Sequence, residues 1–157
     1  MDLFEAIEKR ASVRSYDPVN IPDEHIKKII DAGRRAPSGK NLQPLAFIAI
    51  RAKDTLEKLS RVQGCVGQAS AAIAIVANPD ASPYWLEDAA AAAENMLLAI
   101  KALGYDSVWI QGALRRHEDY ARELLGVPKN RKLIILLPIG EADAETRRLA
   151  KRTEAPK

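Results

Sequence analysis

"DAAAAAENMLLAIKAL" at residues 88–103 is the stretch that decides the fold class of this chain. Alanine and leucine favour helix, and the pattern runs from about Trp85 to Leu103, where Gly104 ends it. A helix that is apolar on nearly every side is expected to be buried. The sequence leaves open whether it lies in the core of its own chain or against a second subunit.

Shorter elements alternate around this helix. The apolar run at 71–78 predicts a buried strand before it, and "YDSVWI" at 105–110 predicts a strand after it. Further strands are expected at 45–50 and 132–140, and further helices at 2–10, 22–35, 53–62 and 116–126. Strands interleaved with helices predict a layered α/β sandwich, and no linker divides residues 1–157 into more than one domain.

Composition excludes several classes of protein. With 47% apolar and 29% charged residues in 157, the chain is globular rather than disordered. A single cysteine, Cys65, rules out an intrachain disulfide, and the wide separation of His25 and His117 argues against a zinc site. The net charge of +3 suits a small anionic ligand and is too weak to indicate nucleic acid.

Neither a signal peptide nor a membrane span is expected. The first ten residues are acidic and amphipathic, without the basic region and apolar stretch of a signal peptide. The longest apolar candidate, at residues 88–100, carries Asp88 and Glu94. We therefore expect a cytoplasmic protein with no membrane partner.

Two arginines stand at the end of the first expected helix. "EKRASVRSYD" at residues 8–17 contains Arg10, Ser12 and Arg14. If the helix continues, positions four apart share a face, so the two guanidinium groups could act together. One interpretation is a solvated basic end that complements the helix dipole. The other is an anion site, because paired guanidinium groups suit a phosphate.

The loop "RRAPSGKNLQPLAF" at residues 34–47 is the second unusual stretch. A turn-rich connection explains its proline, serine and glycine residues well. It explains Asn41 and Gln43 less well, because a side-chain amide offers both a donor and an acceptor. That combination suits the polar edge of a ring such as a pyrimidine.

Four motifs in order resemble the nitroreductase family of flavin enzymes. They are "RASVRSY" at 10–16, "APSGKNLQP" at 36–44, "EDAAAAAENMLLAIKALGYDSVWIQG" at 87–112, and "LIILLPIG" at 133–140 followed by a basic tail. The resemblance implies a central, mostly antiparallel sheet flanked by helices (an α+β sandwich). It also implies bound FMN and a homodimer with active sites at the subunit interface.

The resemblance assigns roles residue by residue. Arg10 would hold the FMN phosphate with Ala11 and Ser12 beside it, and Arg14 would face the pyrimidine end of the flavin. A cation there stabilises the negative charge that reduction leaves on the N1–C2=O edge. The backbone N–H groups of Gln111 and Gly112 would bond flavin N5 or O4. Four loop residues would reach the flavin of the opposite subunit: Pro37, Ser38, Asn41 and Gln43. Leu45 departs from the family pattern, which commonly has an aromatic there.

For Trp109 and for the basic tail, the sequence leaves two possible roles open. Trp109 stands either near the flavin face or in the core. The tail supplies candidate phosphate ligands, or is a frayed basic end: Arg147, Arg148, Lys151 and Arg152. Cys65 is interpreted as a buried structural thiol.

The function implied is an NAD(P)H oxidoreductase. NAD(P)H would reduce FMN, and an electron-poor acceptor, a nitroaromatic or a quinone, would then take its place in a ping-pong scheme. A related flavin enzyme could instead remove a substituent reductively or break down flavin. A flavin-binding protein without turnover is the second class. A nucleic-acid-binding domain ranks last, because an aromatic content of 5% is poor for base stacking.

Overall fold

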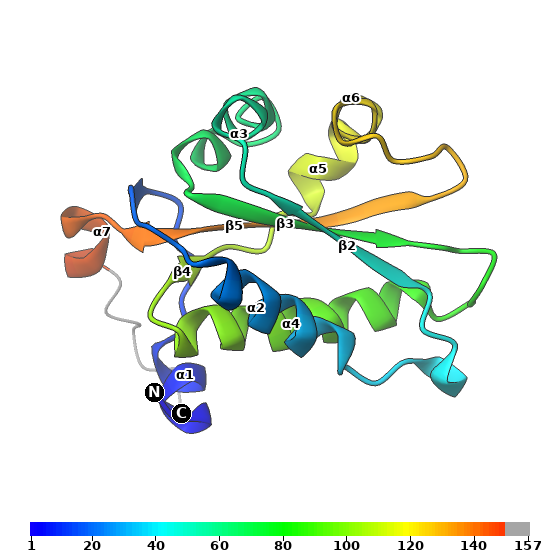
Figure 1. The fold of residues 1–157 in the computed structure, drawn as a ribbon, viewed down its shortest axis with the longest axis horizontal. Coiled ribbons are helices and arrows are strands. Elements are labelled where there is room, and N and C mark those ends of the chain that lie inside the picture. The colour runs from blue at the N-terminus through cyan, green and yellow to red at the C-terminus, as the bar shows by residue number, and fades with distance from the viewer. Residues whose placement is uncertain (150–157) are drawn as a thin grey trace.

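A computed structural model, which describes residues 1–149, shows five strands in one sheet whose pairs are all antiparallel (Figure 1). The strand order is β1-β5-β3-β2, and β4 also pairs with β5. The strands are β1 (Tyr16–Asp17), β2 (Leu45–Ile50), β3 (Ala71–Ala77), β4 (Asp106–Ser107) and β5 (Lys132–Ala142). The expected antiparallel α+β sandwich is confirmed.

Helices cover both faces of this sheet. Figure 1 shows α3, α5 and α6 on one side of it and α2 and α4 on the other, with α1 beyond α4. The α-helices are α1 (Leu3–Lys9), α2 (Asp23–Arg34), α3 (Lys53–Leu59), α4 (Trp85–Ala102), α5 (Gly112–Arg116), α6 (Glu118–Leu125) and α7 (Ala144–Leu149). Two short 3₁₀ turns, η1 (Gly39–Asn41) and η2 (Gly64–Gln68), complete the described elements.

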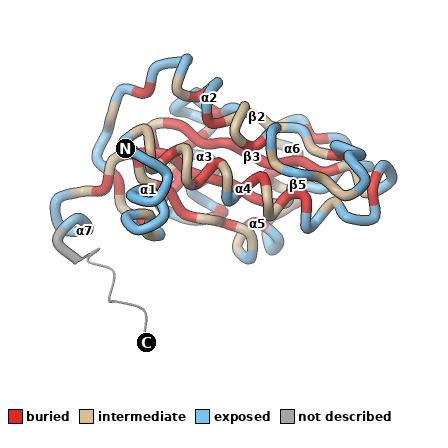
Figure 2. The backbone as a smooth tube through the Cα atoms, turned by 90° about the horizontal axis from the view of Figure 1, so that it is seen from below, coloured by how far each residue is buried: buried red, intermediate tan, exposed pale blue. Residues whose placement is uncertain are grey.

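Strand β3 is buried along its whole length because each face of the sheet has its own core (Figure 2). Ala72, Ala74 and Val76 belong to the core under α3 and η2. The alternate residues Ile73 and Ile75 belong to the core under α2 and α4. Successive strand side chains point to opposite faces, so a strand covered on both sides has to be apolar at every position.

Helix α4 is buried inside its own chain on one side. Ala89, Ala93, Met96 and Ile100 are fully buried, and the helix packs closely on α2. A Cβ placed on Gly33 of α2 would lie 2.4 Å from Met96 Cε, so this crossing depends on a missing side chain. Several remaining positions of α4 are half-buried, and that side stays available to a partner.

Helix α1 turns its apolar side chains outward. Leu3, Phe4 and Ile7, which the sequence places on one side of the first helix, are 57%, 80% and 44% exposed. Ala6 is the buried residue of this helix. A capping box between Asp2 and Glu5 begins it, so local hydrogen bonds support the helix although its apolar face is exposed.

The strand expected at 105–110 is interrupted. Asp106 and Ser107 pair with β5, and Ile110 pairs again with Leu136. The register that joins these pairs puts Val108 opposite Pro138, at a position where both partners should exchange N–H···O bonds. Proline has no N–H to donate, so the ladder breaks at that pair.

Other expected boundaries were also wrong. The helix expected at 116–126 begins at Glu118, because His117 has a non-helical backbone (φ −125°, ψ 21°), and the short helix α5 before it was not expected. The first helix ends at Lys9 rather than at residue 10. Strand β1 and helix α7 were not expected, since both are fastened by contacts between the two ends of the sequence.

Candidate active site

The segment after α1 is extended. Arg10 caps the helix with an extended backbone (φ −64°, ψ 126°), Ser12 pairs with Ser107, and Val13 N donates to Ser107 O at 3.0 Å. Arg10 and Arg14 therefore do not share a helix face, and that part of the sequence analysis was wrong. In an extended segment alternate side chains share a side. Val13 is buried while Ser12 and Arg14 are exposed, as this alternation requires.

Arg10 and Arg14 are free of carboxylate partners among the residues that the structure describes. Five other described arginines do have such partners: Arg34, Arg35, Arg51, Arg122 and Arg147. The charge of Arg14 also acts on two buried groups. Burial raises the pKa of the Cys65 thiol and of the Tyr16 hydroxyl, and the Arg14 cation opposes both shifts. An unpaired cation beside a buried cluster is suited to an incoming anion.

Residues 107–112 lie next to this segment. The Ser12–Ser107 bridge joins the two stretches, and Gln111 then begins α5. Trp109 Nε1 donates to Gln111 Oε1 at 3.0 Å, and the half-buried indole packs on the core beneath α2 and α4. A Cβ built on Gly112 would meet no atom within 4 Å, so the backbone here borders open space. A ring could approach such a backbone closely.

The loop at 37–44 has a defined shape. Three of its residues other than glycine have positive φ, namely Lys40 (52°), Asn41 (57°) and Gln43 (49°). Gln43 Nε2 donates to Asn41 Oδ1 at 2.9 Å, and Gln43 N donates to Ser38 Oγ at 3.1 Å. A positive φ is unfavourable for residues other than glycine. The hydrogen bonds within the loop and its packing against neighbouring elements therefore have to stabilise this conformation.

A cavity of about 410 Å³ lies beneath the loop. Pro37, Ser38 and Gln43 line it, together with the buried carboxyl of Asp88 on α4. Leu45 also lines this cavity. The amide groups and the space beside them therefore come from one loop and the elements that support it.

The loop and the arginine segment do not meet within one chain. In Figure 1 the loop that contains η1 and the segment after α1 lie at opposite ends of α2. Helix α2 has 12 residues, so at 1.5 Å per residue it separates its ends by about 18 Å. The predicted site residues thus form two groups. Residues 10–14 and 109–112 make one group, and residues 37–43 make the other.

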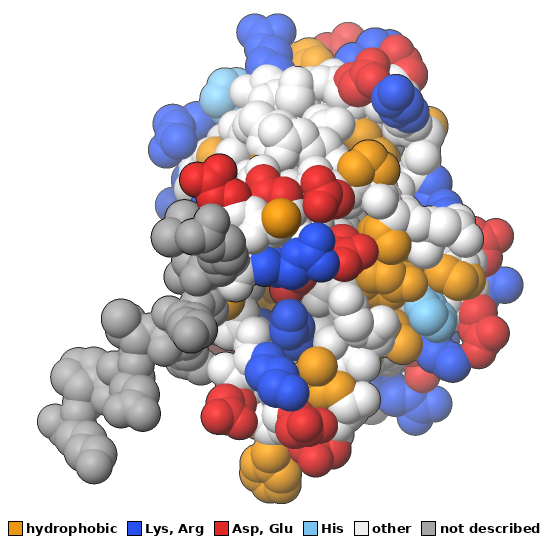
Figure 3. Space-filling model, turned by 90° about the vertical axis from the view of Figure 1, so that its left-hand side faces the viewer, with side chains coloured by type: hydrophobic (Ala, Val, Ile, Leu, Met, Phe, Trp, Pro, Cys, Tyr) orange, Lys and Arg blue, Asp and Glu red, His pale blue; other side chains and the backbone are white. Residues whose placement is uncertain are grey.

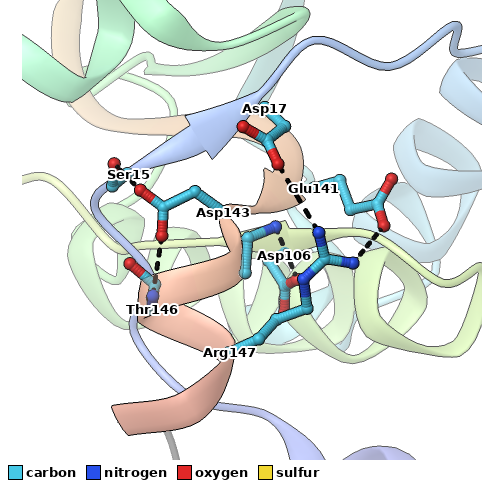
Figure 4. Close-up of polar contacts among 8 residues, drawn as sticks. Ser15, Asp17, Asp106, Glu141, Asp143, Thr146 and Arg147 are labelled. Atoms are coloured by element: carbon cyan, nitrogen blue, oxygen red, sulfur yellow. Dashed lines mark hydrogen bonds and ion pairs between the residues drawn. The ribbon is translucent and has the colours of Figure 1, made fainter.

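One C-terminal candidate, Arg147, makes ion pairs in the described structure (Figure 4). Arg147 pairs with Glu141 at 2.6 Å and with Asp17 at 3.5 Å. Asp143 accepts from Thr146 N at 2.7 Å and from the Ser15 hydroxyl, and these bonds lower its pKa to about 2. Figure 3 shows the resulting mixture of acidic and basic side chains at the end that carries α1 and α7.

This cluster fastens α7 against β1 and β5. Arg147 and Ala11 line one shallow hollow of about 320 Å³, so the cluster lies near the arginine segment. With its guanidinium held by two carboxylates, Arg147 serves in this chain to dock α7. Arg148 is part of α7, and Lys151 and Arg152 lie outside the described residues. Their expected contact with phosphate stays a prediction.

Asp88 is the residue that sequence reasoning missed. It is 4% exposed and accepts a hydrogen bond from Gly39 N at 2.8 Å. A buried carboxyl needs a hydrogen-bond partner, but Glu87 and Asp88 both stand in the first turn of α4 and the sequence does not show which of them is buried. Elsewhere in residues 1–149 no group of three or more potential metal ligands comes together, and no described helix is both long and apolar enough to cross a membrane.

This chain resembles known proteins over most of its length. The model of the nitroreductase family matches residues 7–74 and 62–141. A putative NADH dehydrogenase/NAD(P)H nitroreductase of Archaeoglobus fulgidus is 39% identical, over 88% of this chain and 84% of that protein. An FMN-dependent nitroreductase of Clostridium difficile superposes with a TM-score of 0.82 at 29% identity, covering 98% of this chain and 99% of the other. A nitroreductase with bound FMN from Bacteroides fragilis gives 0.80 at 27% identity, covering 100% and 94%.

Proposed function

Because the chain belongs to the nitroreductase family, we propose that it is an FMN-dependent oxidoreductase that takes electrons from NAD(P)H and passes them to an electron-poor acceptor. The acceptor is a nitroaromatic or a quinone, and the two substrates use the site in turn. The observation that carries this proposal is the pair of arginines without carboxylate partners in the described residues, Arg10 and Arg14, on a segment bridged to Ser107, which leads to the open backbone at Gly112. The names of relatives support it, among them an NADPH-flavin oxidoreductase of Vibrio harveyi.

The residues present fit the chemistry of FMN. Its phosphate needs cationic donors, and the fork of donors on Arg10 matches phosphate oxygens, with Ser12 two residues further along the same side. Arg14, the other arginine of this segment without a carboxylate partner in the described residues, suits the N1–C2=O edge of the flavin. Gln111 and Gly112 offer backbone N–H groups, and the space beside Gly112 Cα is open.

When bound, FMN supplies the hydride and electron transfer chemistry that protein side chains lack. The chain's own contribution is to bind and orient it. Arg10 holds one end of the molecule and Arg14 stabilises negative charge at the other. Trp109 holds the side chain of Gln111 through its indole N–H, and the loop at 37–44 presents amide groups to the polar edge of a ring.

We also propose that the site is completed by a second subunit. One chain keeps its two groups of site residues at opposite ends of α2, whereas a two-fold related copy can bring the loop of one chain to the arginines of the other. The outward apolar face of α1 and the half-buried side of α4 offer the surfaces that such a dimer would cover.

The test is an anaerobic reduction assay. Purified protein reconstituted with FMN should bind it in a ratio of one per chain, and NADH or NADPH should bleach its visible absorption. Adding a quinone or nitroaromatic should then restore the colour. Protein that binds FMN but is not bleached by either nucleotide would be a flavin-binding protein without turnover, and protein that binds no flavin would refute the proposal.

Oligomeric state provides a second test. Sedimentation measured across a dilution series should show FMN leaving the protein as dimers dissociate. A stable monomer that retains tightly bound FMN would contradict the shared site.

A further inference from the structure

Only one of the two oxygens of the buried Asp88 carboxyl has a hydrogen-bond partner among the described residues. Oδ1 accepts from the backbone N–H of Gly39, and Oδ2 is buried with no partner among the described residues. Asp88 lies in the first turn of α4, where the partial positive charge of the helix end favours a carboxylate. An apolar residue would suit this buried position better if packing were its only purpose. The single hydrogen bond therefore indicates that the carboxyl serves to bind the backbone N–H of Gly39.

That hydrogen bond holds a loop that needs an outside support. Positive φ at Lys40, Asn41 and Gln43 makes the loop unfavourable on its own. Gly39 begins this stretch, and a Cβ placed on it would lie 2.2 Å from the ring of Tyr84. The start of α4 therefore holds Gly39 in two ways, because Tyr84 packs against its Cα and Asp88 binds its N–H.

The same helix also holds the end of α2 that leads into the loop. Asn95 lies two turns after Asp88 on α4, and its Nδ2 donates to Ala32 O at 3.1 Å. Residues seven apart share a helix face, so both polar side chains of this face bind backbone of the α2–loop segment. Helix α4 thereby holds both Gly39 in the loop and the last turn of α2 that precedes it.

We propose that Asp88 is a positioning residue, which fixes the loop at 37–44 in the shape with which Pro37, Ser38 and Asn41 reach the flavin. The flavin part of this inference rests on the proposed function. The anchoring part rests on the Gly39 hydrogen bond and on the strained backbone after it. Asp88 acts through the loop and makes no contact with FMN itself.

The experiment compares three variants in the full dimeric protein. Asp88→Ala removes the acceptor, Asp88→Asn keeps an oxygen for Gly39 N–H, and Glu87→Ala removes an exposed carboxyl from the same turn as a control. Amide exchange of Gly39 should accelerate at least ten-fold in Asp88→Ala, with exchange in β3 unchanged. The dissociation constant of FMN should rise at least ten-fold in the same variant. Asp88→Asn and Glu87→Ala should stay within about three-fold of the unmutated protein.

Equal losses in Glu87→Ala, or unchanged Gly39 exchange and FMN affinity in Asp88→Ala, would overturn the proposal. If Asp88→Ala fails to fold, amide exchange measured on the unmutated protein without FMN tests the anchor instead. Gly39 N–H should then be protected from exchange and Lys40 N–H should not, because only the former has an acceptor in the described structure. Equal exchange of the two amides would refute the anchor. Because this comparison needs no flavin, it separates failure of the anchor from failure of the proposed function.

Discussion

Replacing Arg14 by alanine should lower the midpoint potential of bound FMN. Arg14 has no carboxylate partner in the described residues and lies on the same side of its extended segment as Ser12. A charge-assisted hydrogen bond contributes about 1.5–3 kcal/mol. The exposure of Arg14 in the single chain favours the lower end of that range. For a two-electron couple ~1.4 kcal/mol corresponds to about 30 mV, so the expected drop is about 30 mV.

The matched control is Arg10→Ala, which removes the same type of side chain four residues earlier. It should weaken FMN binding through loss of the phosphate contact and leave the potential nearly unchanged. Both variants are titrated spectroelectrochemically with FMN at saturating concentration, so that differences in occupancy do not enter. An unchanged potential in Arg14→Ala, or a larger drop in Arg10→Ala, would refute the assignment of the two arginines.

Three further changes test other parts of the structure. Gly140→Ala places a Cβ 2.8 Å from Tyr16 Cβ and should destabilise the fold by about 1–3 kcal/mol in urea unfolding; an unchanged midpoint would contradict the close contact. Asp143 has a folded-state pKa of about 2, below its usual 3.8, so its stabilisation is present above pH 4 and is lost as pH falls toward 2. The melting temperature should therefore fall less steeply over that window in Asp143→Asn, and equal slopes would refute stabilisation by the hydrogen bonds of Asp143. Trp109→Phe removes the donor to Gln111 Oε1 and should weaken FMN binding; unaltered affinity would show that the amide needs no such support.

The sequence by itself determined the elements whose signals are local. Strand β2 runs over Leu45–Ile50 as expected, and β3 is buried throughout because its apolar run is uninterrupted. Helix α4 ends close to the expected place because Gly104 has φ +92°, which suits glycine. Apolar runs, helix periodicity and glycine stops depend on neighbours within a few residues, so they can be read without the fold.

Only the tertiary structure decided the features that depend on residues far apart in the chain. Val108 leaves the ladder because Pro138, thirty positions later, stands opposite it. Arg147 is held by Asp17 at the other end of the chain, so its spacing in the tail could not show its role.

The candidate site shows the same division between local and distant information. Its residue types were visible in the motifs, but the backbone conformation of the segment that carries Arg10 and Arg14 was not. That segment is extended because it pairs with Ser107, and no helix continues through it. The anchoring of the loop by Asp88 was also beyond a local pattern. A hydrogen bond from Gly39 to a helix forty-nine residues later exists only after the sheet has brought α2 and α4 together.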